Sequence, residues 1–393
     1  MTRWALRWLA MLAAVLPVVM ISACTTRPVV PDTRATLFND AAFQPAGVRI
    51  AAADVFAMTP EMRDYFEREV APSQMKRGMQ RGLIDALYAR EQLKLRYDNE
   101  YTRSAAEAFE ARAGNCLSLV VMTAAFAKHA GMPVRYQSVH VDPTYGRRGN
   151  LFFSIGHVNV SLGRYLSVNT ADARSRDWLT IDFLPQADAG RQRFEAVEES
   201  TLIGMFMNNK AAEALGAGRL DDAYWWARAA IEQDRQLLIA YNTLAVIYRR
   251  HGELDDAERV LRFALTLEPD NTNVLGNLAH LVADRGRTEE AQQLQARLAR
   301  LQPDPPFKFF DLGMEAMRRG EWTSARDHFQ REINRDPDYH EFHFWIAQAY
   351  LRIGDASRAR KHLAAALENS GTVEQQATYS AKLQKLKAQR LLN

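Results

Sequence analysis

The feature that most constrains the fold of this chain is a spacing of 34 residues in its second half. Glycines recur at this interval, at Gly218, Gly252, Gly286, Gly320 and Gly354. Alanines recur in the same register, at Ala223, Ala257, Ala291, Ala325 and Ala359. Small residues let two helices approach closely, and glycine supports the turn between them. The spacing therefore predicts a helix–turn–helix unit that repeats and stacks into an all-α solenoid.

One unit, residues 238–271, carries the full pattern. Its matching positions are Tyr241, Leu244, Ala245, Tyr248, Gly252, Ala257, Leu261, Ala264 and Pro269. This pattern resembles the tetratricopeptide repeat (TPR). We expect five units within 204–373, at 204–237, 238–271, 272–305, 306–339 and 340–373. Residues 374–393 are predicted to form one more amphipathic helix that covers the last apolar face. The resemblance implies a concave groove that binds a protein or peptide; the alternative is that the solenoid only braces the first domain.

The first residues are typical of a secretory signal peptide. Arg3 and Arg7 precede an apolar core that is too short to span a membrane, and Ile21-Ser22-Ala23-Cys24 follows it. These four residues resemble the lipobox of bacterial lipoproteins. The resemblance implies cleavage after residue 23, a lipid on Cys24, and an outer-membrane anchor facing the periplasm. The alternative is an ordinary signal peptide with an incidental cysteine. Residues 24–58 are predicted to be a tether.

The second of the two cysteines, Cys116, follows a Gly-Asn turn and begins an apolar stretch with helical spacing. A thiol at a helix N-terminus faces unpaired N–H groups and the positive end of the helix dipole, which favour the thiolate. With Cys24 assigned to the lipid, Cys116 has no partner for a disulfide. A thiolate at this position has the properties of a nucleophile.

Residues 59–200 are predicted to form an α+β domain. Helical patterns cover 60–70, 74–94, 104–112 and 116–129, with Gly131 as a stop signal. Strand patterns follow over 134–141, 153–162, 165–168 and 178–183. Two of these strands carry polar residues that are costly to bury alone: His157 with Asn159 and Ser161 on one face, and Asp182 within an apolar run.

Residues 95–190 resemble the transglutaminase-like superfamily, in the segments Thr102 to Ser118, His157 to Leu162 and Thr180 to Phe183. The resemblance implies a papain-like fold in which Cys116 is the nucleophile, His157 the base and Asp182 the orienting acid. It also implies that the Cys116 backbone N–H contributes to an oxyanion hole, for which Gln137 is the candidate second donor. Asp172 and Asp177 are the fallback acids.

Each of these residues also has a structural interpretation. Cys116 could be a packed small apolar residue, His157 an ordinary half-buried histidine, and Asp182 the partner of a nearby arginine. We expect no metal site, because no His, Cys or acidic residues stand at ligand spacing on one element, and no cofactor is implied. A net charge of +3 over 393 residues gives no argument for nucleic-acid binding.

The leading hypothesis is a cell-envelope lipoprotein whose cysteine domain acts as an amide hydrolase or acyltransferase on a protein or peptide. In the alternative, the first domain is catalytically inactive and the TPRs serve as a scaffold for protein–protein interactions in the envelope. A third hypothesis keeps the fold and uses Cys116 as a redox sensor, without a role for Asp182.

Overall fold

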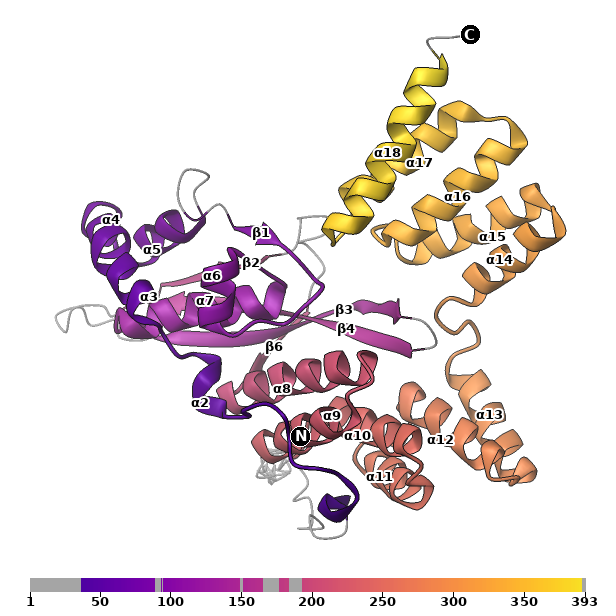
Figure 1. Ribbon diagram of the computed structural model, residues 1–393, viewed down its shortest axis with the longest axis horizontal. Coiled ribbons are helices and arrows are strands. Elements are labelled where there is room, and N and C mark those ends of the chain that lie inside the picture. Colours follow the sequence, from indigo (N-terminus) through magenta and orange to yellow (C-terminus); the bar gives the residue numbers. More distant parts are fainter. Residues whose placement is uncertain are drawn as a thin grey trace, which may run out of the picture.

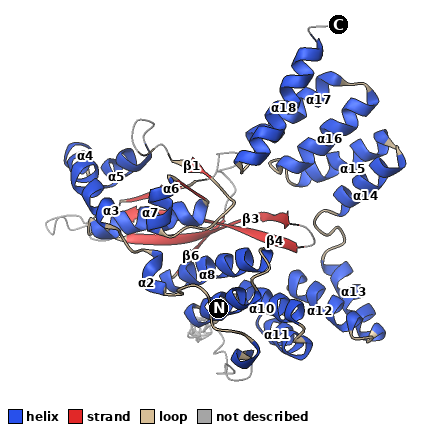
Figure 2. Ribbon diagram, in the orientation of Figure 1, coloured by secondary structure: helices blue, strands red, loops and turns tan. Residues whose placement is uncertain are grey.

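The computed structural model describes residues 37–88, 93, 95–148, 151–164, 177–183 and 193–390. A region of helices and strands comes first, and pairs of helices follow (Figures 1 and 2). The predicted signal peptide and Cys24 lie outside the described residues. So does the strand predicted at 165–168.

Short helices precede the sheet. They are α2 (Ala52–Val55), α3 (Pro60–Tyr65), a π-helical stretch (Phe66–Val70), α4 (Ala71–Arg77), α5 (Met79–Tyr88), α6 (Ala105–Ala111) and α7 (Cys116–His129). Thr59 caps α3 by accepting a hydrogen bond from the Met62 N–H. The helix expected over 74–94 is wrong in its extent. It is broken at Gly78, whose φ of +85° ends α4 before α5 begins at Met79.

The sheet has four antiparallel strands in the order β5-β4-β3-β6. Its strands are β3 (Val134–Arg148), β4 (Leu151–Gly163), β5 (Trp178–Ile181) and β6 (Arg193–Val197). A separate parallel ladder joins β1 (Arg96–Tyr97) to β2 (Ala113–Gly114). Helices followed by an antiparallel sheet agree with the α+β prediction, whereas β1, β2 and β6 have no counterpart in it.

Five helix pairs and a final helix make up the described residues from 199 to 390. We number the pairs repeat one (α8, Glu199–Gly216; α9, Leu220–Gln233), repeat two (α10, Leu238–His251; α11, Leu254–Leu267), repeat three (α12, Thr272–Asp284; α13, Thr288–Leu301), repeat four (α14, Lys308–Arg319; α15, Trp322–Arg335) and repeat five (α16, His340–Ile353; α17, Ala356–Glu368). The last helix is α18 (Val373–Arg390), as the sequence predicts. At the turns of repeats two and five, Gly252 and Gly354 have φ values of +102° and +93°. This left-handed conformation explains the recurring glycine.

The segment around Phe43 is not a tether. The Phe43 ring is buried and stacks on Tyr224 of repeat one, with ring centroids 4.0 Å apart. The Tyr248 hydroxyl of repeat two donates a hydrogen bond to the Leu37 carbonyl at 2.9 Å, and its oxygen accepts one from the Asn39 N–H. These aromatic residues bury apolar area, but polar residues separate the apolar residues of this segment in the sequence, so no pattern reveals the packing. The predicted tether is therefore wrong from residue 37 onward.

The hydrophobic core is divided in two. One cluster joins the first domain to repeats one, two and three, and we call residues 37–301 the N-terminal body. A separate cluster holds repeats four and five with α18, residues 307–390, which we call the C-terminal body. The loop between the bodies contains Pro303, Pro305 and Pro306, which delay the start of α14 to Lys308. The uninterrupted solenoid that the 34-residue spacing predicts is therefore broken between repeats three and four, where a loop separates α13 from α14 (Figure 1).

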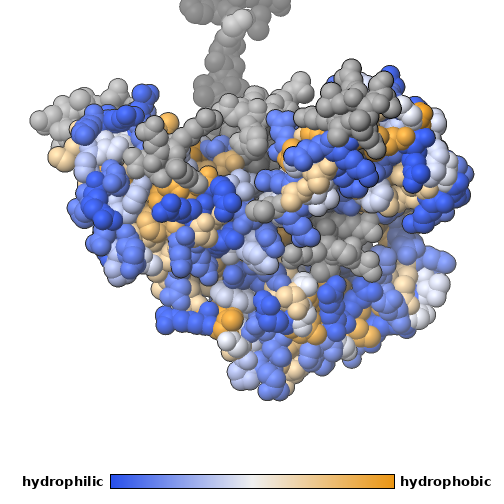
Figure 3. Space-filling view, turned by 45° about the horizontal axis from the view of Figure 1, so that its top comes forward, coloured by the Kyte–Doolittle hydropathy of each residue, from blue (hydrophilic) through white to orange (hydrophobic). Residues whose placement is uncertain are grey.

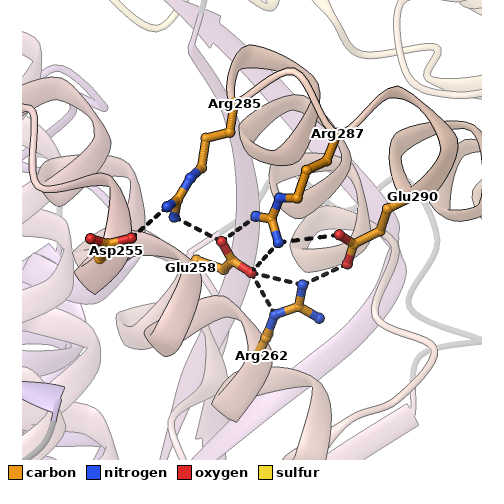
Figure 4. A network of polar contacts seen from close by, with 6 residues as sticks. All are labelled: Asp255, Glu258, Arg262, Arg285, Arg287 and Glu290. Atoms are coloured by element: carbon orange, nitrogen blue, oxygen red, sulfur yellow. Dashed lines mark hydrogen bonds and ion pairs between the residues drawn. The ribbon is translucent and has the colours of Figure 1, made fainter.

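Repeats two and three are also joined by a network of ion pairs (Figure 4). Glu258 on α11 is largely buried and contacts Arg262, Arg285 and Arg287. Hydrogen bonding from Arg287, followed by that from Arg262, lowers the pKa of Glu258. Several charges acting together hold the turn of repeat three against repeat two more firmly than an isolated surface pair does.

No helix among the described residues is both long and apolar enough to cross a membrane. The face drawn in Figure 3 is mainly hydrophilic, with small hydrophobic patches between hydrophilic residues.

Candidate functional site

Cys116 is the first residue of α7, where the sequence predicts it. The preceding Asn115 caps the helix, because its side-chain oxygen accepts a hydrogen bond from the Ser118 N–H at 2.9 Å. The Asn115 amide also donates to the Thr102 hydroxyl at 3.0 Å. The cap therefore fixes both the start of the helix and the position of the thiol, which is 8% exposed.

His157 and Asp182 form the second part of the site. Nε2 of His157, on β4, lies 2.7 Å from Oδ1 of Asp182, which follows the last residue of β5. Next to them, the Ser161 and Thr180 hydroxyls are 2.7 Å apart across the same two strands. The β4–β5 pairing therefore brings His157 and Asp182 together, and the His157 side chain is almost fully buried at 3% exposure.

The other ring nitrogen of His157 is left without a partner. With the Asp182 carboxylate accepting from Nε2–H, a neutral imidazole carries its lone pair on Nδ1. Among the described residues, no group hydrogen-bonds to this Nδ1, nor to the side-chain amide of Asn159, which is fully buried. Buried polar atoms are nearly always satisfied, so these exceptions mark a place where a proton or a ligand atom can be accommodated.

The thiol of Cys116 lies against strand β4. The backbone N–H groups of Val158, Leu117 and Cys116 itself act to lower the pKa of the thiol. Val158 is the residue next to His157, but among the described residues no hydrogen bond joins the Cys116 sulfur to His157 Nδ1. Three backbone donors converging on one sulfur are an arrangement that stabilises negative charge.

Burial nevertheless raises the pKa of the Cys116 thiol, and the nearby negative charge of Asp182 raises it further. The sequence predicts the opposite, a thiolate favoured by the helix N-terminus. That prediction includes the backbone N–H donors, which lower the thiol pKa. It does not include the loss of water around a sulfur covered by β4, which raises it. In the resting protein Cys116 is therefore a neutral thiol, and its use as a nucleophile requires a base to take its proton.

Tyr97, on β1, is a residue near this thiol that the sequence does not predict. Burial, followed by the charge of Cys116, raises the pKa of Tyr97. The ladder between β1 and β2 puts Tyr97 opposite Gly114, two residues before Cys116. A strand of two residues is too short to show a periodic pattern. A parallel pairing of residues 17 positions apart leaves no local signal in the sequence, so the sequence does not reveal that Tyr97 lies near Cys116.

The remaining candidates lie away from the thiol or outside the described residues. Gln137 is on β3 and pairs with Asn159, and the structure shows no hydrogen bond between it and Cys116 among the described residues. Asp177 is exposed just before β5, and its carbonyl accepts a hydrogen bond from Gln80. Asp172 lies outside the described residues. In the described ranges, no group of three or more His, Cys, Asp and Glu residues could hold a metal ion.

Comparison with known proteins identifies the repeats. Two family models described as tetratricopeptide repeat match residues 248–308 and 310–373. These residues are tetratricopeptide repeats. No curated protein matches the chain.

Solved TPR structures resemble part of the chain at low overall similarity. A crystal structure of YrrB, "a TPR protein with an unusual peptide-binding site", is 18% identical and matches with a TM-score of 0.25, covering 46% of this chain and 92% of YrrB. MamA is 21% identical, with a TM-score of 0.25 and coverage of 46% and 96%. TTC0263, a thermophilic TPR protein in Thermus thermophilus, is 18% identical, with a TM-score of 0.29 and coverage of 46% and 98%. At these scores the likenesses carry no argument about function.

Proposed function

We propose that this chain is a TPR scaffold that binds a protein or peptide partner through repeats three, four and five. The observation that supports this best is the division of the core. The C-terminal body is a set of tetratricopeptide repeats with a core of its own, whereas repeats one and two are engaged with the first domain. Stacked helical repeats present extended concave surfaces that are used for binding.

The first helices of the repeats differ in what covers them. In repeat one, α8 packs against β3 and α2 of the first domain. In repeat five, α16 packs chiefly against its neighbours α15 and α17. A partner can therefore reach the later repeats, whereas the first domain covers part of repeat one.

A photo-crosslinking amino acid placed in the full chain tests this proposal. We expect crosslinks from position 280, an exposed histidine on the first helix of repeat three, to a discrete protein or peptide in cells. Gln292 is the matched control, because it is also exposed but lies on the second helix of the same repeat. Equal crosslinking from both positions, or from neither, would contradict binding by the first helices.

A second candidate function is acyl transfer at Cys116, in agreement with the leading sequence hypothesis. A specific observation favours it: the buried His157 is paired with the partly exposed Asp182 and has no hydrogen-bond partner on Nδ1 among the described residues, and the next residue, Val158, is one whose backbone N–H lowers the pKa of the Cys116 thiol. A structural histidine at this depth would be expected to have both nitrogens satisfied.

In the proposed reaction His157 Nδ1 takes the thiol proton while Sγ attacks the carbonyl carbon of an amide. Asp182 holds the imidazole in the required tautomer and stabilises the imidazolium. The protonated His157 then donates its proton to the leaving amine as the C–N bond breaks. Water or a second amine resolves the acyl-enzyme, which makes the domain a hydrolase or a transferase.

The alkylation rate of Cys116 by iodoacetamide, measured against pH in the full chain, tests this second function. If His157 activates the thiol, we expect labelling to persist below the ordinary thiol pKa of about 8.5 and to be lost in His157→Ala. Slow labelling that is indifferent to His157 would identify a structural cysteine. A thiol that is oxidised reversibly with no dependence on Asp182 would favour the redox sensor instead.

The cellular location is also a proposal. We infer an outer-membrane lipoprotein facing the periplasm from the charged start, short apolar core and Cys24 of the sequence. Metabolic labelling with palmitate is expected in the natural chain and absent in Cys24→Ser. Labelling that persists in that variant would disprove the anchor.

A further inference from the structure

Residues 37–47 show how these repeats hold a segment of chain. The Phe43 ring, stacked on Tyr224 of α9, also lies beside two residues at the end of α10. Its centroid is 5.8 Å from that of Tyr248 and 4.3 Å from that of His251. Phe43 therefore fills the step between repeats one and two, where the second helix of one repeat meets the end of the first helix of the next.

Acidic side chains hold the polar groups of the same segment. Asp256, the third residue of α11, accepts a hydrogen bond from the side-chain amide of Asn39 at 2.7 Å. Asp222, the third residue of α9, accepts one from the Gly47 N–H at 2.8 Å. The segment is thus bound by an apolar ring in the step and by donor groups that meet carboxylates at the starts of the second helices.

The step between repeats two and three is filled in another way. The 34-residue spacing puts Glu258, Arg285 and Glu290 at positions that contact residues 37–47 one repeat earlier. These side chains belong to the ion network of Figure 4, in which Arg285 pairs with Glu258 at 2.9 Å. The chain's own charges therefore occupy this step, and the next step falls at the break between the two bodies.

The step between repeats four and five carries a different set of residues. The equivalent positions are those of Arg326, Tyr350, Ile353 and Arg358. Tyr350 retains the tyrosine of repeat two, and Ile353 is 39% exposed. The Arg358 side chain is 65% exposed, and its guanidinium lies over the Tyr350 ring, 5.7 Å from the centroid. This step therefore combines an apolar surface that solvent reaches with an exposed cation.

Positive charge predominates around this step. Arg326 pairs with Asp327 at 2.6 Å, and Arg358 pairs with Asp355 at 3.3 Å. Arg352, at the end of α16, is exposed and has no acidic partner among the described residues. Three arginines against two acidic residues make the step attractive to negative charge.

The charge at one position decides what the step can bind. Arg358 is the third residue of α17, as Asp256 is the third residue of α11. Asp256 accepts a hydrogen bond from the amide of Asn39, whereas an arginine has only donors. A guanidinium makes its strongest hydrogen bonds with carboxylates. A segment bound at this step is therefore acidic where residues 37–47 have Asn39.

We propose that the step between repeats four and five binds a short acidic segment of another protein. An apolar side chain of that segment packs on Tyr350 and Ile353, as Phe43 packs between repeats one and two, and a carboxylate pairs with Arg358. The site goes beyond the function proposed above, because it lies on the second helices and the ends of the first helices. Either surface can bind without the other.

Two peptides that differ in one charge test the site. Both are fluorescently labelled copies of residues 37–47, one carrying Asn39→Asp and the other Asn39→Lys. Fluorescence anisotropy with the full chain measures the Kd of each. We expect the acidic peptide to bind about fivefold more tightly, as for one exposed charge pair. In Arg358→Glu the preference should reverse.

Arg300→Glu is the matched control, because Arg300 is an exposed arginine on the second helix of repeat three. It should leave the preference unchanged. Arg358→Glu adds an acid near the N-terminus of α17, where the helix dipole favours it, so the fold should be retained with an unchanged Tm. No binding of either peptide, or a preference that Arg358→Glu leaves unaltered, would overturn the proposal. So would an equal effect of Arg300→Glu.

Two further outcomes separate this site from the alternatives. If the unaltered copy of residues 37–47 binds as tightly as the acidic peptide, the step accepts that segment of a second copy of the chain, and the acidic partner is disproved. If the peptide preference holds while position 280 gives no crosslinks, only the first-helix surface is lost, and the site between repeats four and five stands.

Discussion

Repeats one and two differ from repeats four and five in what their side chains contact. The Glu213 carboxylate of repeat one accepts a hydrogen bond from the Thr102 N–H at 2.6 Å, and Asn209 donates to the Thr102 hydroxyl. That hydroxyl also accepts from Asn115, the cap of the Cys116 helix. In repeat four, Glu332 instead accepts bonds from backbone N–H groups at the start of its own α14.

This difference shows how one repeated sequence makes two kinds of contact. The early repeats use partly buried polar groups to hold the first domain, and their contacts extend to the start of α7. The later repeats use the equivalent elements to complete their own core. Bracing and binding, the two roles that the sequence leaves open for the solenoid, are therefore proposed for different parts of it.

The largest expected effect comes from removing a buried aromatic ring from each of the two hydrophobic cores in turn. Phe43→Ala removes a buried ring that stacks on repeat one, and Phe329→Ala removes a fully buried ring of the C-terminal body. Each change should cost about 3–5 kcal/mol. Calorimetry of the full chain should show two unfolding transitions, with each variant lowering a different one. If both variants lower a single common transition, the two bodies fold as one unit.

A smaller effect is expected from adding one methyl group at either of two helix glycines. A Cβ on Gly313 of repeat four would lie 2.5 Å from the Phe329 ring, whereas one on Gly276 of repeat three would meet only Leu298, at 3.7 Å. Gly313→Ala should therefore destabilise the C-terminal body by about 1–3 kcal/mol. Gly276→Ala should be neutral or stabilise by up to about 1 kcal/mol. Chemical denaturation checks both, and similar losses in the two variants would show that their surroundings do not differ.

Acid should weaken the C-terminal body through a histidine pair. His343 Nε2–H donates to the Pro337 carbonyl, so its Nδ1 is free to accept from His362 Nδ1–H, at 3.0 Å. Burial, and then the charges of His343 and Lys361, lower the pKa of His362 to about 4. Because this pKa lies below the ordinary 6.5, the stabilisation is complete above pH 6.5 and is lost as pH falls toward 4.

The corresponding measurement is the Tm of the C-terminal transition at pH 7 and pH 5. The natural chain should lose stability by less than about 1.4 kcal/mol per pH unit for this histidine, because solvent partly screens it. His362→Phe should show a smaller fall, with the remainder due to His340, whose pKa burial also lowers to about 4. An unchanged pH dependence in the variant would mean that the pair does not titrate with unfolding.

The contrast between local and distant contacts also explains what the sequence could predict. The start of α7 at Cys116, its end at His129 and the helix pairs follow from caps, glycines and periodicity, which act within a few residues. The pairing of His157 with Asp182 was predicted through a family resemblance, and the structure places the two side chains in contact.

Distant contacts escaped prediction for a physical reason. Periodicity reports which face of a helix is apolar but not which element covers it, so the packing of Phe43 on repeat one and the break after α13 could not be inferred. Burial had the same effect at Cys116: the helix N-terminus was visible in the sequence, but the covering strand that raises its pKa was not. The position of Tyr97 opposite Gly114 could not be predicted, because it depends on a two-residue parallel ladder.

The division between bracing and binding repeats is tested most directly by photo-crosslinking at positions that the 34-residue spacing makes equivalent. Ala212 of repeat one and Gln348 of repeat five stand in the same register on their first helices. With the crosslinking amino acid introduced into the full chain at one position at a time, we predict capture of a partner from position 348 and none from position 212. Capture from position 212 as strong as that from position 348 would contradict the account.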